Sequence, residues 1–100
     1  MVGHGVYPTL GPRRAVLEPA TYMLLRSLSF HGVAITDSLS VVRGHAAEWA
    51  VAAARAGADL LLFTSPADAA RAIRALLPLA RAGELDDHVR RVLAFRAGLR

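Results

Sequence analysis

Three short apolar runs, separated by segments with helical character, constrain the fold of this 100-residue chain more than any other feature. The runs cover residues 1–6, 33–36 and 58–63, and glycine or proline lies at or beside each of them. Short apolar runs between such breakers are typical of buried strands in a parallel sheet. Because the strands alternate with helices, the sequence predicts an α/β fold with right-handed crossovers.

Four helices are predicted between and after these runs. They begin near Pro19, cover residues 45–56, begin again at Pro66, and cover residues 85–97. Proline is favoured in the first turn of a helix, and Gly57 suits the cap of the second helix. Pro78 is expected to kink or end the third helix. The predicted order is therefore strand, helix, strand, helix, strand, helix, helix.

A carboxylate residue, Asp37, follows directly after the C-terminal end of the central run. Functional groups of parallel sheets gather at the carboxyl ends of the strands. An unpaired carboxylate is costly to bury, so Asp37 is expected at a mouth or a turn. Two interpretations of Asp37 remain open on the pattern alone, a catalytic carboxylate or a side chain that caps the following turn.

The amino-acid composition argues against several classes of function. The chain has no cysteine, and its four histidines show no zinc spacing, so neither a metal nor a disulfide is predicted. All 12 basic residues are arginine, and the net charge is +4. Arginine without lysine is consistent with genomic base composition rather than with a partner. The arginines of the last predicted helix, Arg90, Arg91, Arg96 and Arg100, fit a solvated face better than a phosphate-contacting one, so no nucleic-acid partner is expected.

The sequence also contains no clear motif for a cofactor site, a membrane span or a targeting signal. The pair Gly3 and Gly5 lacks the third glycine of a dinucleotide fingerprint, so no cofactor is expected. No apolar run approaches the ~20 residues of a membrane-spanning helix. No secretory pattern follows Met1, which leaves a cytoplasmic location as the default expectation and the true location unknown.

Five segments, in this order, resemble glycoside hydrolase family 3. They read MVGHGVYP, LLRSLSFHG, ITDSLS, AAARAGADLLLF and GELDDHVRRVLAFRAGL. The resemblance is strongest to the bacterial β-N-acetylglucosaminidase (β-N-acetylhexosaminidase) branch, and it covers most of this chain but only the final part of a longer domain. It implies a partial (β/α)8 TIM barrel, about its last three β/α units. Residues 1–100 would then be the C-terminal fragment of the family's catalytic barrel.

The same resemblance assigns roles to two residues. Asp37 matches the nucleophile of retaining hydrolysis of terminal β-linked N-acetylglucosamine, and His4 matches a position near the sugar-binding end of the barrel. Ser38, which directly follows Asp37, is a candidate to line the same mouth and bind the sugar. The alternatives for His4 and Ser38 are a loop histidine and a serine that satisfies turn amides. The sequence also departs from the family, because Ser38 stands where the β-glucosidase branch has tryptophan, and Val41 where methionine is usual.

A general acid/base is the main functional group that the sequence lacks. The resembled branch carries it on a loop of the Lys-His-x-Pro-Gly-His-Gly type, and no such motif occurs in this sequence. His31, His45 and Glu18 are poorly placed to replace it. We therefore expect the isolated chain to be inactive.

An incomplete barrel would also leave a strand edge and apolar faces uncovered. The expected partners are thus a carbohydrate substrate in the full-length context, a complementary half-barrel, or a second copy of the chain. The alternative function is that of a non-catalytic α/β half-domain that associates with another protein chain.

Overall fold

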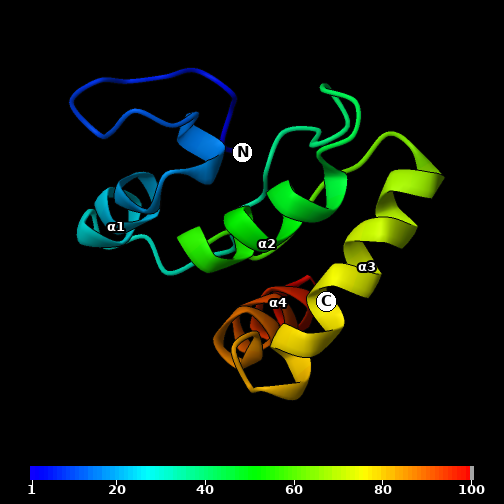
Figure 1. The fold of residues 1–100 in the computed structure, drawn as a ribbon. Helices are drawn as coiled ribbons and strands as arrows, with labels where there is room; N and C mark the ends of the chain where they lie inside the picture. Colours follow the sequence, from blue (N-terminus) through cyan, green and yellow to red (C-terminus); the bar gives the residue numbers. More distant parts are fainter. Residues whose placement is uncertain (100) are drawn as a thin grey trace.

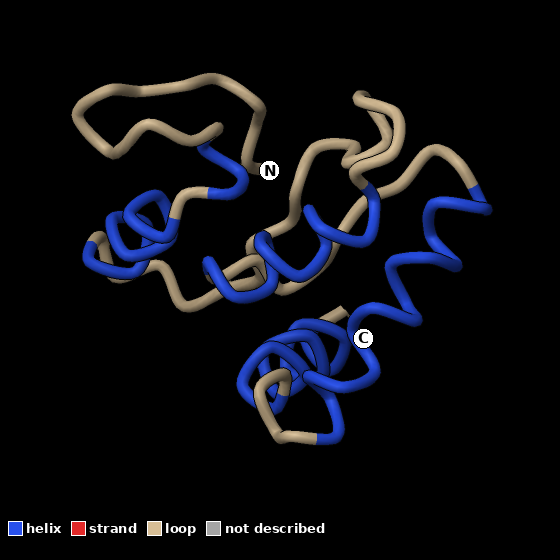
Figure 2. Tube along the Cα trace, in the orientation of Figure 1, coloured by secondary structure: helices blue, strands red, loops and turns tan. Residues whose placement is uncertain are grey.

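The computed structural model describes residues 1–99 and contains short helices joined by extended loops (Figure 1). In chain order these are the 3₁₀ helix η1 (Ala15–Leu17) and the α-helices α1 (Pro19–Ser27), α2 (Ala46–Ala56), α3 (Pro66–Arg81) and α4 (Asp86–Gly98). No strand forms within the described residues, and Figure 2 shows only helices and loops. The predicted α/β fold with a partial (β/α)8 barrel is therefore wrong for this structure.

Extended segments do lie side by side, but each pairing is a single bridge. Val2 forms a parallel bridge with Thr36, and Ile35 forms one with Leu60. The Val2 amide donates to the Ile35 carbonyl at 2.8 Å, and the Thr36 amide to the Leu60 carbonyl at 3.0 Å. The three predicted strands are thus neighbours in the expected parallel sense without becoming strands.

Side chains explain why the second pairing stops after one bridge. Beyond Leu60, the next amide of that segment to face its neighbour is that of Leu62, and it donates to the Thr36 hydroxyl at 3.0 Å. The Ser38 amide donates to the adjacent Asp37 carboxylate at 2.8 Å. Threonine and aspartate side chains compete in this way with regular backbone pairing. The two hydrogen bonds that would lengthen the bridge into a strand are therefore diverted.

The helices agree closely with the sequence prediction. Pro19 begins α1, Gly57 caps α2 with a φ of 135°, and the Ser65 hydroxyl accepts the Asp68 amide at the start of α3. Pro78 does not end α3, which continues to Arg81. Local signals such as caps and apolar periodicity were thus sufficient for the helices.

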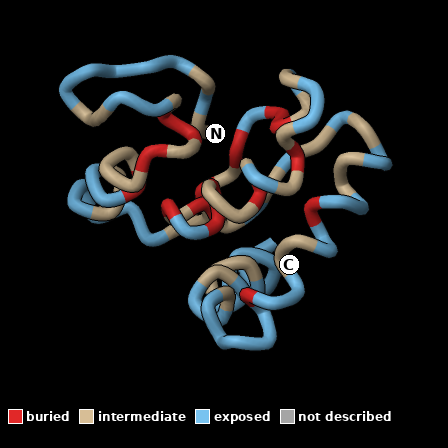
Figure 3. Tube along the Cα trace, viewed as in Figure 1, coloured by how far each residue is buried: buried red, intermediate tan, exposed pale blue. Residues whose placement is uncertain are grey.

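The core lies between α2, η1 and the extended segments (Figure 3). Its buried members are Val16, Tyr22, Ala34, Leu39, Ala53, Ala56 and Ala58. The alanines of α2 allow close packing, and the Tyr22 hydroxyl donates to the Val16 carbonyl at 2.7 Å. Burial, with the charge of Asp59, raises the pKa of Tyr22 far above its ordinary value. By contrast, α4 contains no buried residue.

Candidate functional site

Asp37 lies at the end of the central extended segment and is exposed. One carboxylate oxygen, Oδ1, accepts the Ser38 amide. The other, Oδ2, has no hydrogen bond within residues 1–99, and Asp37 is exposed although its neighbours Thr36 and Ser38 are buried. Asp37 therefore caps its own turn through one oxygen and leaves the second available to a ligand.

The structure brings His4 and Ser38 into contact beside Asp37. The His4 Nε2 atom lies 2.7 Å from the Ser38 carbonyl oxygen, so it is the protonated nitrogen that donates. The Ser38 hydroxyl lies 3.2 Å from that of Thr64 and accepts the Ser40 amide. All three sequence-predicted site residues thus belong to one cluster, in which His4 and Ser38 are occupied with holding the turn.

The Trp49 ring, on α2, lies next to His4 of this cluster. Its ring centroid lies 5.9 Å from that of His4, and 5.3 Å from that of His45, which stacks on it. The Arg14 guanidinium lies 5.0 Å from the same ring, within cation–π range. This grouping was not predicted from the sequence, because its members come from three separate parts of the chain.

A cavity of about 700 Å³ with polar and apolar lining begins at Ser40, after the Asp37 turn, and Asp37, His4 and Ser38 do not line it. Its lining includes hydroxyl and guanidinium groups from the loop before α2 and from the start of α3: Ser40, Arg43, Thr64, Ser65 and Arg71. Arg71 is paired with Asp68 at 3.1 Å, which partly offsets the positive charge. A lining of this kind suits a polar, hydroxyl-bearing ligand.

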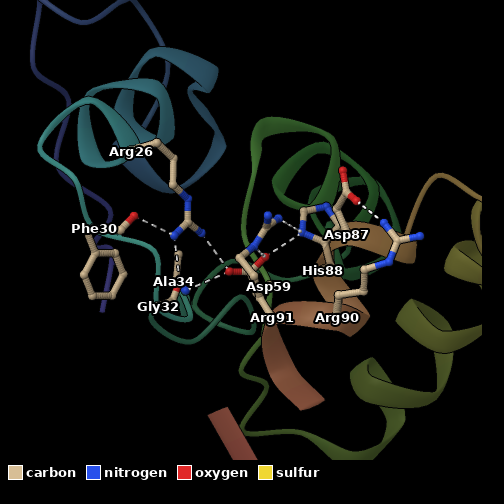
Figure 4. Close-up of polar contacts among 9 residues, drawn as sticks. All are labelled: Arg26, Phe30, Gly32, Ala34, Asp59, Asp87, His88, Arg90 and Arg91. Carbon is tan, nitrogen blue, oxygen red and sulfur yellow. Dashed lines mark hydrogen bonds and ion pairs between the residues drawn. The ribbon is translucent and has the colours of Figure 1, made fainter. Parts of the chain in front are cut away.

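A second cluster, centred on Asp59, was not predicted from the sequence (Figure 4). The Asp59 side chain is 0% exposed and contacts Arg26 at 2.9 Å, His88 at 2.7 Å and Arg91 at 2.9 Å. The Ala34 amide donates to it at 3.0 Å. A buried aspartate in an apolar run requires such partners, and that requirement was the one signal in the sequence.

The electrostatics of this cluster favour an ionised carboxylate. Burial pushes the pKa of Asp59 upward, but hydrogen bonds from the Ala34 amide, His88 and Arg91 hold that pKa below its ordinary value. Asp59 accepts a hydrogen bond from the Ala34 amide, and Ala34 comes three residues before Asp37 in the central segment. The Asp59 cluster therefore lies at the opposite end of the paired segments from the candidate site. It joins α1 and α4 to the core and shares no residue with the Asp37 cluster.

Two further observations concern metal ions and membrane-spanning helices. Across residues 1–99, no three histidine, cysteine or acidic side chains come together in a group that could hold a metal ion. In the same residues, no helix combines the length and the apolar character needed to cross a membrane.

Comparison with known families gives a match to the description "Glycosyl hydrolase family 3 N terminal domain", over residues 1–95. No curated protein matches the sequence significantly.

Several solved structures are similar. A glycosyl hydrolase of the GH3 family from Mycobacterium smegmatis is 34% identical over 91% of this chain, with a TM-score of 0.72. A fungal multi-domain GH3 β-N-acetylglucosaminidase is 24% identical over 97% of this chain, with a TM-score of 0.83. Zn-bound CbsA from Thermotoga neapolitana is 19% identical over 98%, with a TM-score of 0.81. The last two similarities concern the fold alone.

This chain spans only part of each of these proteins. It covers 32% of the mycobacterial chain, 24% of CbsA and 13% of the fungal chain. Each of these solved proteins is therefore about three times as long as this chain, or longer.

Proposed function

The chain belongs to glycosyl hydrolase family 3, and from that premise we propose that Asp37 is the nucleophile of a retaining glycoside hydrolase. The observation that carries the proposal is the exposed Asp37 carboxylate, with one free oxygen, at the end of an otherwise buried segment. A cavity that begins at Ser40, three residues after Asp37, has hydroxyl and guanidinium groups in its lining, and a sugar needs polar partners of this kind.

In the proposed reaction, the Asp37 carboxylate attacks the anomeric carbon as the bond to the leaving oxygen breaks. A general acid protonates that oxygen, and water then hydrolyses the covalent glycosyl–aspartate ester. The acid must lie ~5–5.5 Å from the nucleophile. No residue of this chain is proposed for that role, so the acid comes from another part of the complete enzyme.

The proposed substrate is a terminal β-linked N-acetylglucosaminide, and the proposed branch is the bacterial β-N-acetylglucosaminidase branch. The ITDSLS segment around Asp37 supports both proposals. The contacts of His4 and Ser38 support a role in which they fix the Asp37 turn close to the sugar. The Nδ1 atom of His4 is buried without a partner in the described residues, which makes direct sugar contact the weaker role.

A chimera tests this proposal in a complete enzyme. Residues 1–95 would replace the matching section of the mycobacterial relative, and hydrolysis of an aryl β-N-acetylglucosaminide would be measured. We expect Asp37→Asn to lower kcat roughly 10⁴-fold or more, the scale seen when a nucleophile is removed. Asp87→Asn is the matched control, because Asp87 is an exposed carboxylate on α4. An Asp37→Asn chimera as active as its parent would exclude Asp37 as the nucleophile.

The isolated chain provides a second test. We expect no hydrolysis of the same substrate by residues 1–100 alone, because the general acid is missing. Turnover by the isolated chain that Asp37→Asn abolishes would show that this chain contains its own acid.

A second candidate function is that of a non-catalytic domain that associates with another protein chain. One observation favours it, the uncovered apolar side chains Leu60 and Leu62, which are 37% and 36% exposed beside the core. Mixing the chain with the complementary part of the mycobacterial relative separates the two functions. Restored hydrolysis favours the first, and binding without hydrolysis favours the second.

A further inference from the structure

His4 holds the turn that carries Asp37, and it does so through one atom. The His4 Nε2 atom lies 2.7 Å from the Ser38 carbonyl oxygen, which can only accept a hydrogen bond, so Nε2 carries the proton. The amide of the same Ser38 donates to Asp37 Oδ1 at 2.8 Å. The orientation of the Asp37 carboxylate therefore depends on how firmly the His4 ring is held.

The His4 ring has no second hydrogen bond to hold it. Which nitrogen of a histidine carries the proton is commonly set by the hydrogen bond of the other nitrogen. In His4 that other atom, Nδ1, is buried and has no hydrogen-bond partner within residues 1–99. The backbone on either side of His4 is fixed, because the carbonyls of both neighbouring glycines accept amides from residues 15 and 16. The ring itself must therefore be oriented by packing.

Trp49 of α2 provides that packing. The ring centroids of Trp49 and His4 lie 5.9 Å apart with their planes at 40°. This separation is within the range of about 4.5–7 Å in which aromatic rings attract one another. Trp49 lies on a regular helix and packs against the hydrophobic core, so it gives the His4 ring a fixed neighbour.

Two further side chains hold the Trp49 ring. His45 stacks on it, with 5.3 Å between the centroids and 21° between the planes. The Arg14 guanidinium lies over the ring at 5.0 Å from its centroid, where cation–π attraction acts. Arg14 comes directly before η1, and η1 is hydrogen-bonded to the segment around His4. The Trp49 ring and the His4 backbone are thus tied to the same part of the chain.

We propose that Trp49 is a positioning residue for Asp37. Its ring holds the His4 imidazole with Nε2 toward the Ser38 carbonyl, and this contact keeps the Asp37 turn in one conformation. Trp49 acts through His4 and has no contact of its own with the reacting atoms. This role rests on the proposed function of Asp37 and deepens it, because Trp49 lies outside the five segments that resemble family 3.

NMR of the full chain with isotope-labelled histidine tests the ring contact without any activity. In the parent chain we expect His4 to be protonated at Nε2, with a proton that is protected from exchange. Trp49→Met fills much of the same space without a ring, and it should mix the two tautomers of His4 and abolish that protection. Trp49→Phe keeps a ring and should retain most of the parent behaviour. His31, which is exposed, is the internal control in each spectrum.

A second variant keeps the NMR test decisive if Trp49→Met does not fold. Arg14→Met removes one support of the Trp49 ring at a residue outside the core, and it should change the His4 signals in the same direction. A parent chain with His4 protonated at Nδ1 would overturn the proposal without any variant. Parent-like His4 signals in a folded Trp49→Met chain, or in Arg14→Met when Trp49→Met is unfolded, would also overturn it.

The chimera with the mycobacterial relative tests the effect on hydrolysis. Trp49→Met should lower kcat roughly tenfold to a hundredfold and change KM little, because a misplaced nucleophile slows the chemical step. His4→Gln keeps an N–H donor but no ring, so Trp49→Met should have little further effect in that background. Phe95→Met, at an exposed aromatic residue of α4, is the matched control. Additive losses in the double variant would show that Trp49 does not act through His4.

These measurements separate the role of Trp49 from that of Asp37. If Asp37→Asn leaves hydrolysis by the chimera unchanged, Asp37 is not the nucleophile, and the NMR result still decides whether Trp49 holds His4. If Asp37→Asn abolishes hydrolysis while Trp49→Met changes neither the His4 signals nor kcat, the proposed function stands and the role of Trp49 is wrong.

Discussion

Asp59 is a buried carboxylate that joins parts of the chain far apart in sequence. It pairs with Arg26 of α1 and with His88 and Arg91 of α4. Because α4 has no buried residue, its ion pairs with Asp59 are an important part of what holds it to the rest of the chain. Removing one partner of a buried pair leaves the others uncompensated, which is more costly than the pair itself is favourable.

We predict that Asp59→Asn lowers the free energy of unfolding by about 3 kcal/mol. The asparagine keeps the size of the side chain but removes the charge that faces two guanidinium groups. Urea unfolding followed by circular dichroism measures the change. Asp87→Asn, which breaks the exposed pair with Arg90, is the control and should change stability by less than about 1 kcal/mol.

The same carboxylate predicts a pH dependence. The folded state lowers the pKa of Asp59, so its contribution is present above the unfolded pKa of about 4. That contribution is lost as the pH falls through the folded pKa. We expect the stability of the parent chain to decrease below pH ~4 more steeply than that of Asp59→Asn. Parallel pH profiles for the two chains would contradict the assignment.

The two clusters were not equally predictable from the sequence. The resemblance to family 3, through the MVGHGVYP and ITDSLS segments, singled out three residues, Asp37, His4 and Ser38, and the structure places them close together. Their catalytic and binding roles stay predictions. Asp59 was not predicted, because its partners lie 32 or 33 residues away along the chain, or 29 in the case of His88. No periodic pattern reveals a contact of that range.

At the scale of elements, the helices were predictable and the strands were not. Helix ends depend on local features, such as Pro19, Gly57 and Ser65, that the sequence displays directly. Strand pairing depends on hydrogen bonds between distant segments, and in this chain the Thr36 hydroxyl takes the Leu62 amide. The apolar runs therefore predicted strands, whereas the structure has extended segments that meet in the expected parallel sense through single bridges.

We predict that Thr36→Val lowers the free energy of unfolding by about 1 kcal/mol, because the buried Thr36 hydroxyl no longer accepts the hydrogen bond of the partly exposed Leu62 amide. Thr36→Ser retains the hydroxyl and should recover most of the loss. Chemical denaturation of the three chains measures both effects. Equal stability of the valine and serine variants would show that the hydroxyl is not an important acceptor.

Hydrogen exchange should separate α4 from α2. Because α4 has no buried side chain and α2 has five, amides of α4 should exchange faster than those of α2 in the parent chain. Arg91→Gln, which removes one ion pair with Asp59, should accelerate exchange in α4 and leave α2 unchanged. Mass spectrometry of peptides from each helix measures this, and uniform acceleration in both helices would contradict a local role for Arg91.

At the scale of the whole molecule, the chain is a family 3 unit shorter than the solved proteins it resembles. It covers at most 32% of those chains, and its apolar surfaces beside segment 58–63 are uncovered. The candidate nucleophile lies at one end of the paired segments and the Asp59 cluster at the other. This separation lets the proposed chemistry and the stability of the chain be tested by different variants.

The most direct test of the proposed role of Asp37 is to trap the covalent intermediate. The chimera with the mycobacterial relative would be incubated with a fluorinated N-acetylglucosaminide that turns over slowly, digested, and analysed by mass spectrometry. We predict that the peptide containing Asp37 gains the mass of one sugar, and that Asp37→Asn abolishes this gain. A sugar attached to another carboxylate, with Asp37 unmodified, would contradict that role.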